Sequence, residues 1–409
     1  MTNNYEIETT KPSFGVLDDI KVVYSAMEIA APTAAAIMGE WGADVTWVEN
    51  HWNGDSMRDT TWVKEMERRN MRSISMNQFS DEGKEVLFGL IKDADIFIES
   101  SKGPVFARKG ITDEVLWKIN PRLVIVHVSG FGQSGKQSRI NTAAYDLTVA
   151  AYSGMVAQNG FEDQPVGMHP YTGDYINSLM IISASLAALH KVKVSGVGES
   201  IDLAMHETLL RVGSYYMMDY LNAGVKYPRP GGRHQNLCAI GEYACADGFI
   251  ALCIYGVPQN RYLLEVIGLG HLWGTEDIPE GTSALWKSNP QAELIEQKLE
   301  EYLSTQSRHD VERDFSEHKM AAQAINEFED VISDPHIKER DTFITWENGE
   351  GKTVTGLNTF PKFKNFPGEF WRPMPRLGQD TKYLLERAGF SEEDIQRFIE
   401  NGTVKIDEA

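Results

Sequence analysis

Asp174 is the residue of this sequence best placed for covalent chemistry, because it is a lone carboxylate where a long apolar segment begins. From Tyr175 to Val192 apolar residues recur at helical spacing, which predicts a helix with Asp174 at its N-terminus. Free backbone N–H groups and the helix dipole at that position favour the ionised carboxylate. An ionised aspartate can attack a thioester, although aspartate is also among the most common helix N-caps.

A short basic segment is the second feature with chemical potential. Lys102, Arg108 and Lys109 lie within eight residues of one another, beside a Gly-Pro turn, and follow a predicted strand at 96–99. Open α/β folds bind ligands at the carboxyl ends of such strands. Cations in this arrangement suit phosphate groups, which accept charge-assisted hydrogen bonds. The arginines that we expect to add to the cluster are Arg68, Arg69 and Arg72.

Charge and composition limit the partners of the protein. The 409 residues carry a net charge of −20 with a pI near 5.0, which argues against nucleic acid, because its phosphate backbone demands a basic face. Any polyanionic ligand must therefore depend on a local basic cluster. The N-terminus is polar and acidic, and no uninterrupted apolar run reaches membrane-spanning length. We expect a cytoplasmic protein with no membrane partner.

Metal chemistry is not indicated by the sequence. The three cysteines, Cys238, Cys245 and Cys253, are spaced by seven and eight residues, whereas zinc sites usually need close Cys-x-x-Cys pairs. His169 lies five residues before Asp174, and we interpret it as a packed or loop histidine. No role is assigned to His234.

Strands and helices alternate in the first half of the chain, which predicts a doubly wound, mostly parallel, Rossmann-like sheet. Long helices are expected at 175–192 and 203–221. The expected strands are 20–25, 44–49, 72–76, 96–99 and 123–129, and the expected helices between them are 32–41, 81–92 and 112–120.

A change of composition at 227–233, with two prolines and a glycine pair, marks a domain boundary. Residues 242–254 then predict a hairpin around Asp247 and Gly248. We therefore expect a large domain at 1–226, a small α+β domain at 227–327 and a return to the large domain at 328–409.

The segment 130–135 matches Gly-x-Gly-x-x-Gly and makes a dinucleotide-binding dehydrogenase the natural alternative. Such a fingerprint should open a helix within the first βαβ unit, but the turn at 25–32 has no glycine and the residues after Gly135 are polar. We interpret 130–135 as a loop near the active site and expect no NAD.

Taken in order, 129–135, 144–146, 152–154, Asp174 and 198–204 resemble the class III CoA-transferases, and the likeness runs nearly end to end. In that family the residue at the position of Asp174 is the acyl-accepting nucleophile. Three stretches resemble most closely the members that exchange CoA between crotonobetainyl-CoA or γ-butyrobetainyl-CoA and carnitine. These stretches are 40–50, 101–110 and 361–365.

The resemblance implies coenzyme A as the carried group, an acyl-CoA donor, a carboxylate acceptor and an interlocked homodimer. It also implies that Lys102 and the second residue of the Arg108–Lys109 pair contact CoA, although family members known to act on carnitine have Arg where this chain has Lys109. Backbone N–H groups at 130–135 or at Gly231 and Gly232 are candidate donors to the oxyanion.

Related racemases share the fold but need a His in a Gly-His-Asp motif, where this chain has Ala144, Tyr145 and Asp146. Tyrosine, with a reference pKa near 10, is a poor proton-transfer partner there, so transfer outranks racemisation. Formyl, oxalyl or succinyl transfer and a non-catalytic CoA-binding protein stay open. The aromatic candidates for enclosing a quaternary ammonium are Trp41, Tyr145, Tyr171 and Tyr175.

Overall fold

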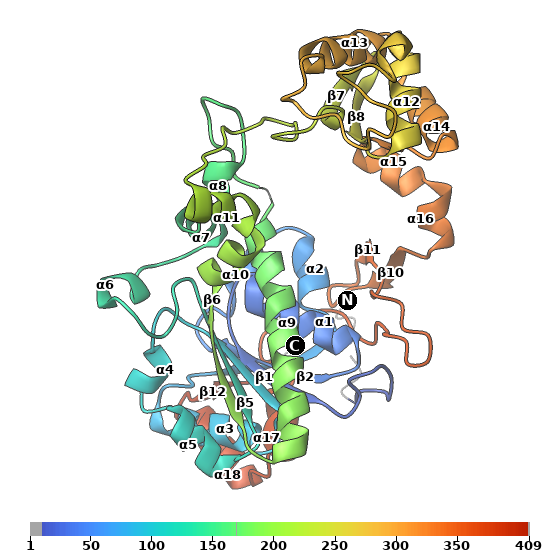
Figure 1. Cartoon of the computed structure of the whole chain (residues 1–409). Helices are drawn as coiled ribbons and strands as arrows, with labels where there is room; N and C mark the ends of the chain where they lie inside the picture. Colours follow the sequence, from blue (N-terminus) through green and yellow to red (C-terminus); the bar gives the residue numbers. More distant parts are fainter. Residues whose placement is uncertain (1–9, 169, 408–409) are drawn as a thin grey trace. The chain divides into compact units, whose positions relative to one another are not determined.

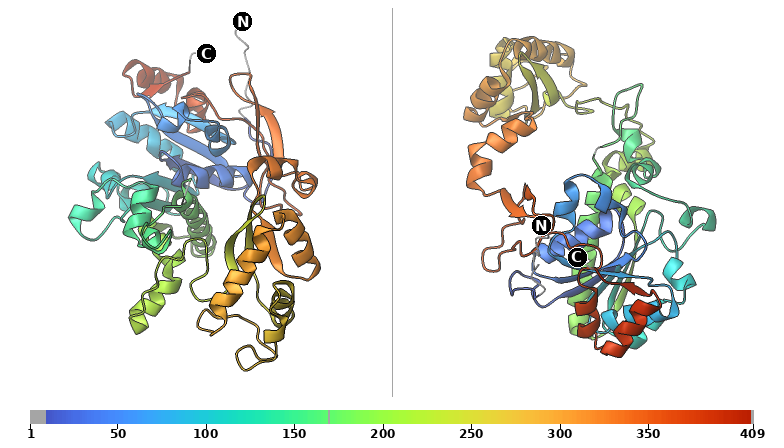
Figure 2. Two further views of the ribbon diagram at one scale, coloured as in Figure 1. Left: turned by 90° about the horizontal axis from the view of Figure 1, so that it is seen from above. Right: turned by 180° about the vertical axis from the view of Figure 1, so that it is seen from behind.

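The computed structural model describes residues 10–168 and 170–407, and its contacts divide the chain into two compact units (Figure 1). The large unit joins Met1–Met155, Met168–Ser214 and Lys338–Ala409, and the small unit joins Val156–Gly167 and Tyr215–Ile337. The sequence-based boundaries were 226/227 and 327/328. Figure 2 shows the C-terminal helices of the large unit beside its N-terminal strands.

A seven-stranded sheet forms the centre of the large unit, in the order β12-β3-β2-β1-β4-β5-β6. Its strands are β1 (Lys21–Ser25), β2 (Asp44–Asn50), β3 (Met71–Met76), β4 (Ile96–Ser100), β5 (Val124–Ser129), β6 (Glu199–Ala204) and β12 (Val404–Lys405). All pairs are parallel except β12 with β3. The predicted parallel sheet is confirmed, and β1 and β4 are neighbours at the point where the strand order reverses.

Helices α1 (Ala30–Glu40) and α9 (Thr172–Ser195) pack together on one face of the sheet (Figure 1). Helix α1 is buried along its whole length and is rich in alanine, which lets α9 approach closely. Helix α9 has the length and mean hydropathy, 1.2, of a membrane-spanning helix, properties that core helices share. Here its buried side chains face α1 and β5 within the large unit.

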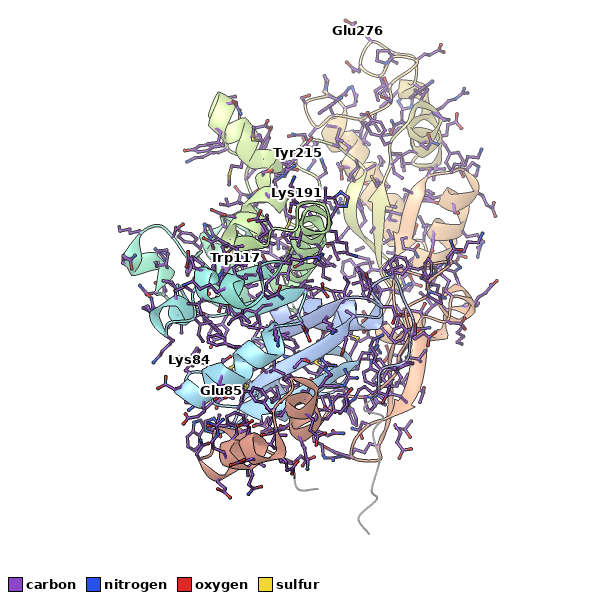
Figure 3. All side chains as sticks on the ribbon, turned by 90° about the horizontal axis from the view of Figure 1, so that it is seen from below. Lys84, Glu85, Trp117, Lys191, Tyr215 and Glu276 are labelled. Atoms are coloured by element: carbon purple, nitrogen blue, oxygen red, sulfur yellow. The ribbon has the colours of Figure 1, made fainter. Side chains whose placement is uncertain are left out.

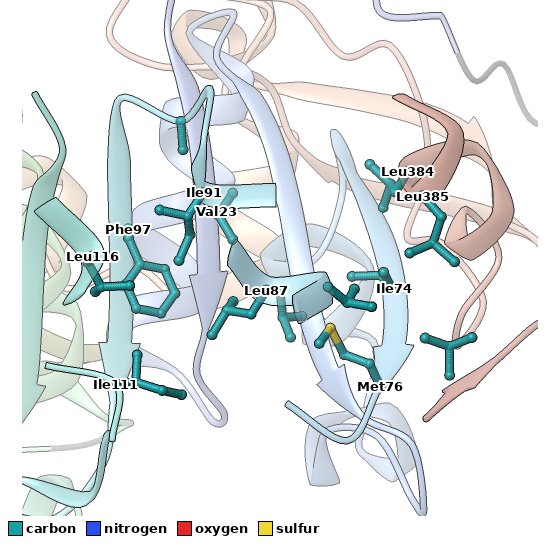
Figure 4. Packing of buried hydrophobic residues seen from close by; sticks show 14 of the residues in the cluster. Val23, Ile74, Met76, Leu87, Ile91, Phe97, Ile111, Leu116, Leu384 and Leu385 are labelled. Carbon is teal, nitrogen blue, oxygen red and sulfur yellow. The ribbon is translucent and has the colours of Figure 1, made fainter. Parts of the chain in front are cut away.

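The opposite face carries the main hydrophobic core of the large unit, shown in Figure 4. Side chains such as Val23, Ile74 and Phe97 point from the strands toward Leu87 and Leu384 of the covering helices. These helices are α3 (Asp81–Ile91), α5 (Asp113–Ile119), α17 (Thr381–Arg387) and α18 (Glu392–Glu400). Both faces of the strands are therefore buried, as expected for a parallel sheet.

Polar contacts tie the C-terminal segment to the N-terminal half. On the outside of the core, Glu85 of α3, labelled in Figure 3, pairs with Arg397 of α18 at 3.3 Å. A buried pair joins Arg372 and Asp380 at 3.0 Å, and both side chains are 1% exposed or less. Asp380 also accepts the backbone N–H of Ser73 in β3, at 2.9 Å. The return of the chain to the large unit is thus fixed by charges as well as by apolar packing.

Further short helices lie between these elements or after β6. They are α2 (Val63–Glu67), α4 (Val105–Arg108), α6 (Gln137–Ile140), α7 (Asp146–Tyr152), α8 (Met155–Gln158), α10 (Met205–Val212) and α11 (Ser214–Ala223). A hairpin of β10 (Phe343–Glu347) and β11 (Thr353–Leu357) lies nearer the C-terminus. The single helix expected at 203–221 is wrong in detail, because β6 extends to Ala204 and the helical segment breaks at Gly213.

The small unit contains a three-stranded antiparallel sheet in the order β7-β8-β9. The hairpin predicted around Gly248 is confirmed, and Gly248 has a φ of 150°, which glycine tolerates. The strands are β7 (Ile240–Cys245), β8 (Gly248–Cys253) and β9 (Ala321–Ala324), and the helices are α12 (Val257–Val266), α13 (Ala292–Ser304), α14 (Arg308–Glu317), α15 (Phe328–Ser333) and α16 (Pro335–Glu339).

Candidate active site

Asp174 is the third residue of α9 and lies in its first turn, as the sequence predicted. It does not cap the helix, because the N-cap position is Tyr171, which has a left-handed φ of 53° and makes no side-chain capping bond. Among the described residues the Asp174 carboxylate accepts no hydrogen bond, and neither oxygen is fully enclosed. Asp174 is therefore an unpaired carboxylate, only 8% exposed, with an opening to solvent.

The surroundings of Asp174 correct our expectation about its charge. Burial, then the neighbouring carboxylates of Asp146 and Glu28, raise the pKa of Asp174 to about 7. We expected the helix N-terminus to favour ionisation, but the backbone N–H of Asp174 is donated to Asp146 Oδ1, at 2.9 Å. The free N–H groups of the first turn are thus partly used by a second acid, and the local field near the carboxylate is negative.

Asp146 begins the short helix α7 and is itself 6% exposed. It approaches α9 closely because Gly173 has no side chain there; a Cβ on Gly173 would lie 2.6 Å from Asp146 Oδ1. The sequence contained Asp146 within the 144–146 motif, but nothing in the pattern indicated that its carboxylate faces Asp174. Asp146 and Asp174 are 28 residues apart, and the local spacing of residues in a sequence does not predict contacts at such separations.

Glu28 reaches the site from the turn between β1 and α1. Its φ of 67° is left-handed, an uncommon conformation for a residue with a side chain. The buried pair of Arg68 and Asp55, 2.7 Å apart, stabilises this turn, because Arg68 donates to the Glu28 carbonyl and Asp55 accepts the Glu28 N–H. The Glu28 carboxylate accepts a hydrogen bond from Ser56 Oγ at 2.6 Å. The sequence offered no signal for this residue.

Contacts between α9 and its neighbours fix the position of the first turn. Ser178 Oγ donates to the carbonyl of Ala30 at the start of α1, at 2.7 Å. Tyr175 donates its hydroxyl to Glu67 of α2, at 3.1 Å. The first turn of α9 is thus held against α1 and α2, while the carboxylate of Asp174 accepts no hydrogen bond among the described residues.

The three cations predicted after β4 are all exposed and lie on one segment that includes α4. Arg108 Nη1 donates to Asn141 Oδ1 at 3.2 Å, whereas Lys102 and Lys109 have no charged partner in the described parts of the chain. The segment starts at the carboxyl end of β4, next to β1. Its cations are therefore available to an anionic ligand at the sheet edge.

Arg72 is not with this cluster. It lies on β3, is 1% exposed, pairs with Asp44 and stacks near the rings of Trp371 and Tyr383. This placement favours a structural role in place of the phosphate contact that we expected. The two further arginines of the expected cluster are also buried in ion pairs, Arg68 with Asp55 and Arg69 with Glu40.

A cavity of about 220 Å³ lies at the switch point between β1 and β4. Residues at the carboxyl end of β1 and in the turn after it, such as Ala26 and Met27, form one wall, and Ser101 and Val105 of the basic segment form another. The turn that forms the first wall continues to Glu28. The cavity thus lies between part of the basic segment and the turn that leads to Glu28.

The remaining expectations have mixed outcomes. His169 lies outside the described residues. In the small unit, His234 Nδ1 accepts the N–H groups of Asn236 and Leu237, each at 3.1 Å, which gives it a structural role.

Three of the expected oxyanion donors are already used. The N–H of Gly132 is donated to Ser129 Oγ at 2.9 Å, and the N–H of Gln133 is donated to the Asp202 carboxylate. The loop at 130–135 is thus tied by its own hydrogen bonds. In the small unit the N–H of Gly231 is donated to the carbonyl of Gly160.

Comparison with known proteins gives one family and several similar structures. The sequence model of CoA-transferase family III matches residues 17–381. A CAIB/BAIF family protein from Brucella suis is 25% identical, with a TM-score of 0.77 over 92% of this chain and 100% of that chain. The protein Rv3272 from Mycobacterium tuberculosis is 22% identical, with a TM-score of 0.79 over 91% and 100%, a likeness that shows the fold alone.

Proposed function

The chain belongs to CoA-transferase family III, and on this premise we propose that it transfers CoA from crotonobetainyl-CoA or γ-butyrobetainyl-CoA to L-carnitine, as an L-carnitine CoA-transferase does. The observation that carries the proposal is the unpaired carboxylate of Asp174 in the first turn of α9. A buried but accessible carboxylate without a hydrogen-bond donor keeps its lone pairs for nucleophilic attack.

The reaction proceeds through two kinds of covalent intermediate. The ionised Asp174 attacks the thioester carbonyl carbon and the C–S bond breaks, which gives an aspartyl mixed anhydride and CoA thiolate. The thiolate then attacks the aspartyl carbonyl, releases the donor carboxylate and forms an aspartyl-CoA thioester. The acceptor carboxylate repeats the two steps in reverse, so that acceptor-CoA leaves and Asp174 is regenerated.

The protein contributes position and exclusion of water. Asp174 is 8% exposed, which limits hydrolysis of the anhydride, and its backbone is held by the contacts of α9 with α1. CoA bound at the switch point keeps its thiolate close during the exchange, and well-oriented groups react as if at an effective concentration of about 10⁵ M or more.

The surroundings of Asp174 support a cationic acyl group. The charged groups that act on Asp174 most strongly, Asp146 and Glu28, are both acids. Tyr145 and Tyr171 stand at the starts of α7 and α9 and are 66% and 51% exposed, so their rings are available to a trimethylammonium group. Trp41 and Tyr175 are engaged elsewhere, through Phe360 and Glu67 respectively.

A panel of substrates tests this assignment. We expect carnitine and γ-butyrobetaine to be accepted with higher kcat/KM than oxalate, formate or succinate, because these three anions carry no cation to offset the negative charge of the site. Mass spectrometry of the CoA products gives the ranking. If oxalate were converted much more efficiently than carnitine, the substrate assignment would be wrong and the reaction class would stand. CoA binding without turnover of any pair would favour the non-catalytic alternative.

CoA recognition is tested by Lys102→Ala. We expect the affinity for CoA to fall about fivefold or more, because an exposed charge contact contributes under about 1 kcal/mol and a charge-assisted hydrogen bond to phosphate roughly 1.5 to 3 kcal/mol. Calorimetry with CoA and with pantetheine compares ligands with and without the nucleotide phosphates. Lys191→Ala removes the same charge from the exposed side of α9 and serves as control. An equal loss for both ligands would remove Lys102 from the phosphate site.

We further propose that Arg108 and Lys109 contact the CoA phosphates, and that the active protein is a cytoplasmic homodimer. Arg108 is already oriented by its hydrogen bond to Asn141, and it lies on α4, whose residues Val105 and Phe106 line the cavity. Size-exclusion chromatography with light scattering gives the mass in solution.

A further inference from the structure

We propose that Asp146 is a positioning residue that sets the pH range in which Asp174 can react, and that it does so through its direct contact with the first turn of α9. The inference rests on the proposed function. It concerns a residue that is neither the nucleophile nor part of the proposed CoA site.

Asp146 is an acid in direct contact with the backbone of the nucleophile Asp174, and it forms no ion pair among the described residues. Its Oδ1 accepts the Asp174 N–H at 2.9 Å, and this is the one hydrogen bond of its carboxylate among the described residues. A Cβ on Gly173 would also lie 3.2 Å from Leu209 Cδ1, so the space around Gly173, where Asp146 meets α9, is close-packed. With 6% exposure the Asp146 charge is weakly screened by water.

The charged groups on the elements around the first turn of α9 do not offset the negative charge near Asp174. Helix α7 supplies Asp146, and the β1–α1 turn supplies Glu28. Helix α2 supplies Glu67, which is bound by Tyr175. On α1 the acid is Glu40, which pairs with Arg69, and on α10 His206 contacts the Gly130 carbonyl. Arg68, a buried guanidinium that contacts the Glu28 carbonyl, pairs with Asp55.

An acid held against Asp174 disfavours a second negative charge there. Asp146 accepts the backbone N–H of Asp174, whereas the Asp174 carboxylate itself accepts no hydrogen bond among the described residues that would favour its ionised form. With its pKa raised to about 7, Asp174 is therefore mostly protonated in weakly acidic solution. A protonated carboxyl group is not a nucleophile, so Asp146 limits the reaction at low pH.

The same contact has a use at neutral pH. A carboxylate of higher basicity is the stronger nucleophile once it has lost its proton. A substrate cation that enters between Asp146, Glu28 and Asp174 favours the ionised form, so binding of a betainyl substrate and ionisation of Asp174 support each other. An uncharged acyl group gives no such support.

Asp146→Asn separates charge from shape. The amide oxygen of Asn can still accept the Asp174 N–H, and the side chain has nearly the same volume, but the negative charge is lost. We expect the acidic limb of the pH profile of kcat/KM to begin near pH 7 in the wild type, where the pKa of Asp174 lies, and about one unit lower in the variant. For a one-unit change, the reactive fraction at pH 6 rises about fivefold, with little change above pH 8.

Titration of the ligand-free protein makes the inference independent of turnover. Carbon-13 NMR of labelled aspartate carboxyl groups follows Asp174 directly, and Asp174→Asn identifies its signal. A lower midpoint in Asp146→Asn, with no transfer activity in either protein, would leave the inference standing and refute the proposed function. An unchanged midpoint and an unchanged acidic limb in a folded Asp146→Asn protein would overturn the inference.

Asp146→Ala is the matched structural control. It removes the hydrogen-bond acceptor together with the charge, so we expect a lower melting temperature as well as the shifted limb. If Asn restores the melting temperature but not the wild-type pH profile, charge and capping are separate contributions. If Asn restores both, Asp146 acts only as a cap and the proposal is refuted.

Discussion

Replacing Asp174 by Asn is expected to abolish CoA transfer, by at least about 10³-fold in kcat, while the protein stays folded and binds CoA. A neutral amide cannot form the mixed anhydride, so the loss should appear in kcat and not in the affinity for CoA. Stability should change little, because the Asp174 side chain makes no capping bond and accepts no hydrogen bond among the described residues. Turnover, calorimetry with CoA and thermal melting measure the three quantities.

A trapping experiment supplies the positive result that a loss of activity cannot. Wild-type protein incubated with acyl-CoA and quenched with hydroxylamine should carry a hydroxamate on the peptide that contains Asp174, since both covalent intermediates are activated aspartyl carbonyls. Asp146→Asn should carry the same label, because it keeps the nucleophile. Retained turnover in Asp174→Asn, together with an unlabelled wild-type peptide, would remove Asp174 from the mechanism.

Replacing Asp380 by Ala is expected to lower the free energy of unfolding by about 3 to 5 kcal/mol, because it leaves the buried guanidinium of Arg372 without its counter-charge. The substitution also leaves the N–H of Ser73 in β3 without its acceptor. Urea denaturation at neutral pH measures the loss.

The double variant Arg372→Met, Asp380→Ala tests the cause of that loss. Removing both charges should recover part of the stability, because the desolvated cation is then absent. Arg372→Met alone leaves a buried carboxylate that still accepts the Ser73 N–H, and so should cost less than Asp380→Ala. A double variant as unstable as the sum of the two single variants would show that the pair is not energetically coupled.

The sequence predicted the sheet well because its strands are buried on both faces. Runs such as 123–129 are almost wholly apolar, and this pattern distinguishes a central parallel strand without reference to other parts of the chain. The strand β6 was not predicted, because its residues Glu199, Ser200 and Asp202 are polar and lie at the edge of the sheet. Edge strands carry less of the apolar signal.

Within the candidate site, local sequence carried a signal for Asp174 alone. Asp174 stood out by its position before an apolar helix, but its charge state depends on Asp146 and Glu28, which other parts of the chain bring to it. Arg72 shows the opposite error. Arg68, Arg69 and Arg72 are close in sequence, which suggested one cluster. Each is instead buried in an ion pair with a different acid, which comes from the loop before α2, from α1 and from β2 respectively.

The position of β12 in the sheet implies an order in which parts of the large unit fold. Residues 404–405 pair with 75–76 of β3, so one edge of the sheet that holds Asp174 is completed by residues more than 300 positions away. Contacts of such high sequence separation form late, and during synthesis β3 emerges from the ribosome long before its partner. Most of the small unit, Tyr215–Ile337, is continuous and can fold first. Until 404–405 are made, β3 is an open edge strand, and a chaperone that covers apolar edges would act on the nascent large unit.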